Sequence, residues 1–248
     1  MHIIMHQSLH AFEQFEYKLT MKGMTKRLKH RPRQAEPITP QILLSFTRFL
    51  DLHDPIDATY WSLFLTAFFA MARKSNLVPS SKAKFDSSKQ LTRGRVLLGE
   101  GCLLLVWSWA KNIQTGNRIH KLPMLEIVGS KLCPVKAFAR MARLVPAGEL
   151  EPAFCLPLGG SVVPVTYHQF NAKLKALIRR TGLDPSRFST HSFRRGGATC
   201  AFKAQVPETL IQLQGDWASE CYKRYLRMGI AEKKEVAQKM ASYVLMAK

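Results

Sequence analysis

Residues 190–199 read Thr-His-Ser-Phe-Arg-Arg-Gly-Gly-Ala-Thr, and residues 215–225 read Gly-Asp-Trp-Ala-Ser-Glu-Cys-Tyr-Lys-Arg-Tyr. His191 and Arg194 are three residues apart and share one face of a helix, so that both can point at the same anion. Trp217 follows, and Tyr225 comes eight residues later within a short basic segment. Imidazole, guanidinium, indole N–H and phenol groups near one another favour the handling of a phosphodiester.

The charge of the chain extends this interpretation. Its 248 residues carry a formal net charge of +20, from 37 lysines and arginines against 17 acidic residues. The excess is spread along the whole chain, and a field of that sign favours polyanions, with nucleic acid ahead of an anionic membrane. The apolar run from Trp61 to Met71 is too short to span a bilayer and predicts a buried helix. We therefore expect a nucleic-acid partner and no membrane.

Cysteine and histidine positions argue against a metal or cofactor. The five cysteines are scattered and form no Cys-x-x-Cys pair, which disfavours a disulfide framework or a structural zinc site and favours a reducing compartment. Histidines at positions 2, 6 and 10 could line one helical face, but no acid or cysteine completes a ligand set. No signal peptide is evident. The chain is expected in the nucleus of a eukaryote or otherwise in the cytoplasm, and not as a secreted protein.

Apolar spacing and capping residues predict a mainly helical α+β fold with a small antiparallel sheet. Predicted helices begin at Thr39-Pro40, cover about 58–72, run from Pro134 to about Leu144 and from Thr166 to Arg180, begin at Thr190, Pro207 and Ser219, and close the chain at about 230–246. Predicted strands are Arg95–Leu98, Cys102–Trp109 and Arg118–Met124, with a tight turn at Gly99-Glu100-Gly101. Residues 145–165, rich in Pro and Gly, predict a loop with one short extended piece at Phe154–Leu156.

Residues 1–36 look like the end of a longer unit followed by a linker. Residues 23–36 are strongly basic and contain a proline, so we expect the linker to touch phosphates; a solvated charge run is the alternative. The linker residues predicted to contact DNA are Lys22, Lys26, Arg27, Lys29, Arg31 and Arg33.

Two further cations, Arg73 and Lys111, lie at positions that suggest a role in the site. Arg73, in Ala-Arg-Lys-Ser-Asn-Leu, follows a very apolar predicted helix, and Lys111, in Trp-Ala-Lys-Asn-Ile-Gln, lies on a predicted hairpin. With the C-terminal residues quoted above, they give an order that resembles the tyrosine recombinase (phage integrase) family. The matching residues are Arg73, Lys111, His191, Arg194, Trp217 and Tyr225. The string Gly-Asp-Trp-x-Ser-x-x-Tyr-x-Arg-Tyr is most similar to the Crypton-type recombinases of eukaryotic transposons.

The resemblance covers roughly residues 37–230 and implies a catalytic domain over 37–248. Residues 1–36 would then be the remnant and linker of an N-terminal core-binding domain, and we expect a truncated or fragmentary protein. The partner implied is double-stranded DNA, on which protomers would associate through the C-terminal helix. One residue departs from the family pattern, because Asn76 stands where members usually carry an acid.

The resemblance also implies roles, with no metal and no cofactor. Tyr225 would attack a DNA phosphorus and form a 3′-phosphotyrosine, which retains the free energy of the phosphodiester for a second transfer. Arg73 and Arg194 would bind non-bridging oxygens through their guanidinium forks. Lys111 would protonate the leaving 5′ oxygen.

His191 would then act as acid–base or hydrogen-bond partner of the nucleophile, and Trp217 as an N–H donor. Arg195, beside Arg194, is expected to contact DNA. Alternatives stay open: Arg73 could cap its helix, His191 and Trp217 could be core residues, Lys121 could replace Lys111, and Tyr222 could replace Tyr225. The function implied is site-specific recombination or integration. A topoisomerase of type IB, or a DNA-binding protein that keeps this fold without cleaving, are the alternatives.

Overall fold

The computed structural model describes residues 20, 34–107 and 119–217. The chain divides into two compact units, Met1–Gln34 and Ala35–Lys248. All elements described below belong to the second unit. The domain boundary predicted after residue 36 stays a prediction.

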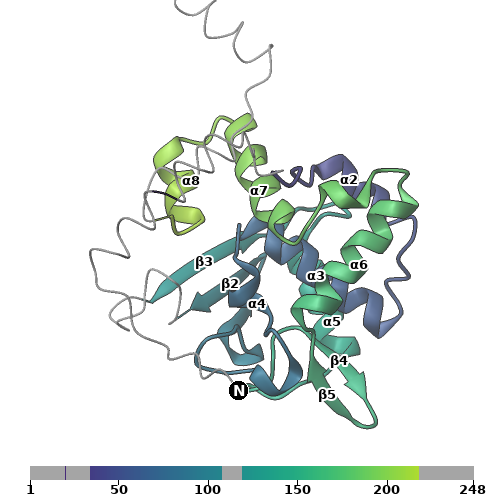
Figure 1. Cartoon of the computed structure of the whole chain (residues 1–248). Helices are drawn as coiled ribbons and strands as arrows, with labels where there is room; N and C mark the ends of the chain where they lie inside the picture. Colours follow the sequence, from purple (N-terminus) through teal and green to yellow (C-terminus); the bar gives the residue numbers. More distant parts are fainter. Residues whose placement is uncertain (1–19, 21–33, 108–118, 218–248) are drawn as a thin grey trace, which may run out of the picture. The chain divides into compact units, whose positions relative to one another are not determined.

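The second unit is mainly helical with two small antiparallel sheets (Figure 1), which confirms the predicted fold class. Its helices are α2 (Pro40–Phe46), α3 (Pro55–Phe69), α4 (Lys74–Leu77), α5 (Pro134–Leu144), α6 (Tyr167–Arg180), α7 (His191–Lys203) and α8 (Glu208–Gln214). Short 3-10 helices are η1 (Lys82–Lys84), η2 (Arg93–Arg95) and η3 (Pro185–Arg187). Its strands are β1 (Val96–Gly99), β2 (Cys102–Trp107), β3 (His120–Leu125), β4 (Cys155–Leu158) and β5 (Ser161–Pro164).

Helix α3 forms the centre of the core, as its sequence predicts. Every residue from Ala58 to Phe68 is buried, and a helix that is apolar on all sides must be surrounded by protein. It packs against α5 and α7 (Figure 1). The Phe64 ring stacks on Phe170 of α6 and on Phe193 of α7, at centroid distances of 5.8 and 5.0 Å. This aromatic stack fixes α7, which carries His191 and Arg194, against the core.

The bounds of α3 differ from the predicted 58–72. The helix begins earlier because the Asp54 carboxylate accepts a hydrogen bond from Asp57 N at 2.8 Å and Pro55 occupies the first turn. It ends at Phe69, because Met71 adopts a left-handed φ of 46° that no helix can continue. Helix α2 likewise ends at Phe46, although Leu50 beyond it is still buried in the core.

The three predicted strands form one sheet in the order β1-β2-β3. Val96 pairs with Leu105, and the turn between the strands has Gly101 at a φ of 63°. Alternate side chains of β2 are buried, as expected for a strand with one face on the core. Trp107 of β2 pairs with His120 of β3. The segment between them, which includes Lys111, lies outside the described residues.

The loop predicted at 145–165 contains a second hairpin, β4–β5, of which sequence reasoning found only the first strand. Leu158 pairs with Ser161 across a two-residue turn. The two turn residues, Gly159 and Gly160, have φ values of 54° and 81°. Tight hairpin turns favour this left-handed geometry. The Gly-Gly pair was therefore a hairpin signal rather than a loop signal.

Predicted helix starts are largely confirmed. The Thr39 hydroxyl accepts a hydrogen bond from Ile42 N at 3.2 Å, and Thr166 forms a capping box with Gln169. The helix predicted to begin at Thr190 does begin there, with His191 as its first residue, but Thr190 does not cap it through its hydroxyl. Its backbone is already helical and its side chain makes no capping bond.

Candidate active site

The elements that carry Arg73 and Arg194 meet at the C-terminal end of α3. After the left-handed residue Met71, the chain extends through Ala72, and Arg73 becomes the N-cap residue of the short helix α4. The Arg73 side chain is a quarter exposed. The reversal at the end of α3 therefore holds a guanidinium at the edge of the core.

Two adjacent glycines of α7 allow it to pack closely, Gly197 on the end of α3 and Gly196 on Ile38. A Cβ at Gly197 would lie 2.1 Å from the Phe68 carbonyl oxygen, and one at Gly196 would lie 1.9 Å from that of Ile38. Such contacts are closer than real Cβ atoms approach, so only glycine allows this packing. The first turn of α7, with His191 and Arg194, is thereby placed beside the end of α3.

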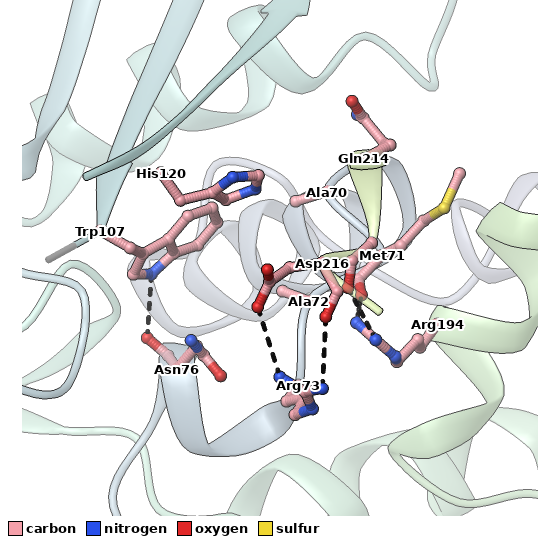
Figure 2. Close-up of a pocket in the computed structure, with 11 residues that line it drawn as sticks. Ala70, Met71, Ala72, Arg73, Asn76, Trp107, His120, Arg194, Gln214 and Asp216 are labelled. Carbon is pink, nitrogen blue, oxygen red and sulfur yellow. Dashed lines mark hydrogen bonds and ion pairs between the residues drawn. The ribbon is translucent and has the colours of Figure 1, made fainter. Parts of the chain in front are cut away.

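Arg194 is buried and held at three points. Its guanidinium donates hydrogen bonds to the Met71 carbonyl, and to the Gly215 carbonyl at 2.7 Å (Figure 2). The Trp217 ring lies over it, with the ring centroid 3.9 Å from Cζ. Arg194 is 3% and Trp217 5% exposed. Trp217 thus contacts the guanidinium face in a favourable cation–π arrangement, and its predicted role as an N–H donor stays a prediction.

Asp216, between the two residues that contact Arg194, contacts Arg73. Its carboxylate oxygen Oδ2 lies 3.7 Å from Arg73 Nη1, and its backbone carbonyl accepts a hydrogen bond from Nη2 at 3.4 Å. Figure 2 shows both contacts on the same side of the guanidinium. The segment Gly215-Asp216-Trp217 therefore contacts both arginines at once. Sequence reasoning quoted this segment but assigned no role to Asp216.

A groove of about 700 Å³ lies next to these residues. Arg73, His191, Arg194 and Trp217, which were predicted as site residues, all line it. Its other lining residues include Lys74, Ser75, Tyr167, His168 and Asn171, which the sequence did not single out. Lys74 Nζ lies 4.7 Å from the centre of the Tyr167 ring. Arg73, Lys74 and Arg194 make the groove basic, and positive charge favours an anion.

His191 is exposed at the mouth of this site, and its pKa is strongly lowered. Partial burial of the imidazole is the largest cause, and the positive charges of Arg194, Arg195, Arg73 and Lys74 add to it. Together they bring the pKa from 6.5 to about 4. The imidazole is therefore neutral at physiological pH and can both accept and donate a hydrogen bond.

Arg195, unlike Arg73, is almost fully buried. It is 3% exposed, whereas a DNA contact needs an accessible guanidinium, and its assignment to DNA stays a prediction.

Asn76 contacts the sheet through its backbone. Its carbonyl accepts hydrogen bonds from Leu91 N at 2.8 Å and from Trp107 Nε1 at 3.4 Å. The Trp107 ring also stacks on His120 at 5.9 Å. Trp107, at the end of β2, and His120, at the start of β3, flank Lys111 in the sequence. They are held near Asn76, which is three residues after Arg73.

Several predicted site residues lie outside the described residues. They are Lys111, Tyr225 and its rival Tyr222, and the linker residues Lys22, Lys26, Arg27, Lys29, Arg31 and Arg33. The C-terminal segment 230–246 is in the same position. Their assignments stay predictions.

Within residues 34–107 and 119–217 no group of three His, Cys, Asp or Glu side chains could hold a metal ion. No helix in that part of the chain is long and apolar enough to cross a membrane.

Comparison with known proteins places the fold. No protein-family model and no curated protein matches the sequence. Among solved structures, the XerH site-specific recombinase bound to a palindromic difH substrate is similar with a TM-score of 0.60 and 17% identity, over 84% of this chain and 53% of XerH. The XerA recombinase is similar with a TM-score of 0.57 and 14% identity, over 94% of this chain and 76% of XerA.

The Tn1549 transposon integrase in complex with a circular intermediate DNA gives a TM-score of 0.60 at 13% identity, over 90% of this chain and 75% of the integrase. The chain spans about half the length of XerH. Identities of this size establish the fold alone. The mainly helical second unit, with its small antiparallel sheets, has the fold of tyrosine recombinase catalytic domains.

Proposed function

We propose that this chain is the catalytic domain of a site-specific DNA recombinase or integrase that breaks and rejoins DNA through a 3′-phosphotyrosine. One observation carries the proposal. Arg73, His191, Arg194 and Trp217, which span much of the sequence, line a single basic groove on a recombinase fold. The proposed kinship with Crypton-type recombinases rests on the string from Gly215 to Tyr225.

Each side chain has a chemical task in this proposal. Tyr225 attacks the phosphorus and becomes covalently linked to the 3′ phosphate, while Lys111 gives its proton to the departing 5′ oxygen. Arg73 offers guanidinium N–H groups to the non-bridging oxygens, whose negative charge grows in the transition state. Arg194, which Trp217 holds in place, adds a second positive charge near the phosphate.

The electrostatics of His191 support a role as hydrogen-bond acceptor for the Tyr225 hydroxyl. A neutral imidazole can receive the phenol proton, whereas an imidazolium cannot. Burial is the largest cause of the lowered pKa of His191, and two of the cations that add to it, Arg194 and Arg73, are those assigned to the phosphate. A bound phosphate offsets their charge, so it raises the proton affinity of His191 at the moment when the tyrosine must lose its proton.

Double-stranded DNA is the proposed substrate. The net charge of +20 and the basic groove support it. Related folds support it too, because XerH and the Tn1549 integrase were captured with DNA.

Covalent trapping tests the proposal. A nicked duplex that releases a short strand after cleavage cannot be religated, so an adduct accumulates. We expect an adduct with the wild-type protein and with Tyr222→Phe, and none with Tyr225→Phe. It should form in EDTA as well, since cationic side chains replace divalent metals. An adduct that survives Tyr225→Phe contradicts the assigned nucleophile.

A DNA-binding module without cleavage is the second candidate. The observation that favours it is the burial of Arg194, whose guanidinium donates to two backbone carbonyls. In this alternative, Arg194 has a structural role only. Under this alternative the protein binds duplex DNA but gives no adduct on any nicked substrate.

We further propose that protomers associate on DNA through residues 230–246, where the spacing of Ile230, Val236, Met240 and Val244 predicts an apolar stripe. An apolar groove of about 720 Å³, lined by residues of α3, α7 and α8, is a suitable acceptor on a second copy. Leu210 and Leu213 on its edge are half exposed.

Deletion after Gly229 tests this assembly. Docking in trans predicts a soluble monomer that still forms the adduct but loses strand exchange between two sites. Docking in cis predicts aggregation, because the apolar groove would lose its cover. Light scattering with and without DNA separates the two, and a stable truncated protein with full strand exchange contradicts both.

A further inference from the structure

We propose that Asp216 is a positioning residue that sets the orientation of Arg73 toward the phosphate. The proposal rests on the proposed function of Arg73 as a phosphate-binding residue. Asp216 lies in the C-terminal third of the chain, far from Arg73 in the sequence.

Two oxygens of Asp216 face two different nitrogens of the Arg73 guanidinium. Oδ2 of Asp216 faces Nη1 at 3.7 Å and its backbone carbonyl oxygen faces Nη2 at 3.4 Å. Two points of contact define the plane of a rigid fork, whereas a single ion pair would leave it free to rotate. The Asp216 side chain is 12% exposed and that of Arg73 25%, so the pair is less screened than a surface pair.

The backbone conformation at Asp216 allows these contacts. Its φ is 49°, a left-handed value that most residues avoid and that Asp and Asn tolerate best outside glycine. Hydrogen bonds from Asp216 N to Leu213 O and from Trp217 N to Gln212 O tie the segment to the end of α8. The turn presents the Gly215 carbonyl to Arg194 and the Asp216 carbonyl to Arg73.

The Asp216 carboxylate lies next to a cluster of positive charges. Arg73, Lys74, Arg194 and Arg195 all lie close enough to His191 to affect its titration. In the part of the chain that the structure describes, Asp216 is the carboxylate in contact with Arg73. A guanidinium has five N–H donors, so one edge on Asp216 leaves other donors for a phosphate.

DNA affinity gives a test that does not depend on cleavage. Removing an acid from a DNA-binding surface should by simple electrostatics strengthen binding. If Asp216 positions Arg73, Asp216→Asn instead weakens binding and lowers the slope of log K against log salt by about 0.9, as Arg73→Gln does, because one phosphate contact is lost. The double variant should be no worse than Arg73→Gln alone. Asn keeps the shape and the left-handed preference of Asp, and Asp86→Asn, on an exposed ion pair with Lys89, is the matched control.

The trapping assay supplies the second readout. Asp216→Asn should slow adduct formation about 100-fold, the effect of a small misplacement of a reacting group. With a methylphosphonate at the cleavage position, which has no charge on the linkage, the deficits of Asp216→Asn and Arg73→Ala should both shrink. A purely structural residue would slow both substrates equally.

The outcomes are distinct. Equal slowing on both substrates, or tighter DNA binding with unchanged or faster adduct formation, overturns the positioning role; the latter would make Asp216 a restraint on Arg73. A wild-type protein that binds DNA but forms no adduct refutes the proposed function, and the affinity test then still decides the role of Asp216. A wild-type protein without DNA affinity refutes both.

Discussion

Replacing Arg194 by lysine tests the candidate site most directly, because it keeps the charge and removes the fork. The guanidinium donates to two carbonyls, those of Met71 and Gly215, and lies under the Trp217 ring. A hydrogen bond to a charged group contributes about 1.5–3 kcal/mol, and a buried cation–π contact about 2 kcal/mol. An ammonium can restore one hydrogen bond and part of the cation–π contact. We therefore expect Arg194→Lys to lower the free energy of unfolding by about 2–4 kcal/mol, because one buried carbonyl loses its donor.

The measurement is urea unfolding of the whole chain, with Arg187→Lys as the matched control. Arg187 also donates a hydrogen bond, to the Glu36 carboxylate at 2.8 Å, but its side chain is 62% exposed. An exposed pair contributes under about 1 kcal/mol, so the control should unfold like the wild type. Adduct formation should fall about 100-fold or more in Arg194→Lys, if the residue also stabilises the transition state. An Arg194→Lys protein as stable as the control would refute the three-point anchoring of this side chain.

Three further predictions follow from particular contacts. Gly197→Ala should destabilise the protein by several kcal/mol in the same assay, because its Cβ would meet the Phe68 carbonyl, whereas Gly148→Ala, with its nearest neighbour at 3.8 Å, should not. Folded His191 has a pKa of about 4 against 6.5 when unfolded, so the unfolded state binds the proton first and stability falls as pH drops from 6.5 to 4. His191→Gln should flatten that dependence in thermal melts at a series of pH values. Deleting residues 22–33 should reduce the salt dependence of DNA binding for all sequences alike, and an unchanged slope would identify the basic linker as a solvated tail.

Local signals explain why much of this fold was predictable. Thr39-Pro40, Pro134 and the pair Thr166 and Gln169 determine their helix starts through neighbours within one turn. The apolar stretch of α3 has one outcome, burial, wherever the rest of the chain goes. The β4–β5 hairpin is predictable only as one short extended piece, because its strands are four residues each, too short to show alternation, and Gly159-Gly160 lies in a stretch rich in Pro and Gly.

The site residues also differ in whether local sequence signals predict that they come together. His191 and Arg194 are one helical turn apart, so their proximity could be inferred from spacing. Arg73 and Trp217 could be assigned only through the resemblance to a family, since 143 residues separate Arg73 from Asp216 and no local rule joins them. The close packing of α7 on α3, which depends on Gly197, brings the elements that carry them together.

Asp216 marks the limit of sequence reasoning in this protein. An aspartate between a glycine and a tryptophan, just beyond a helix, is normally interpreted as a turn residue, and its φ of 49° agrees with that. The same backbone conformation directs its carbonyl and carboxylate at Arg73, while its neighbours contact Arg194. A turn preference and a charge contact are therefore satisfied by one side chain, and only the second bears on phosphate chemistry. Because Asn shares the turn preference and lacks the charge, Asp216→Asn is the substitution that separates the two.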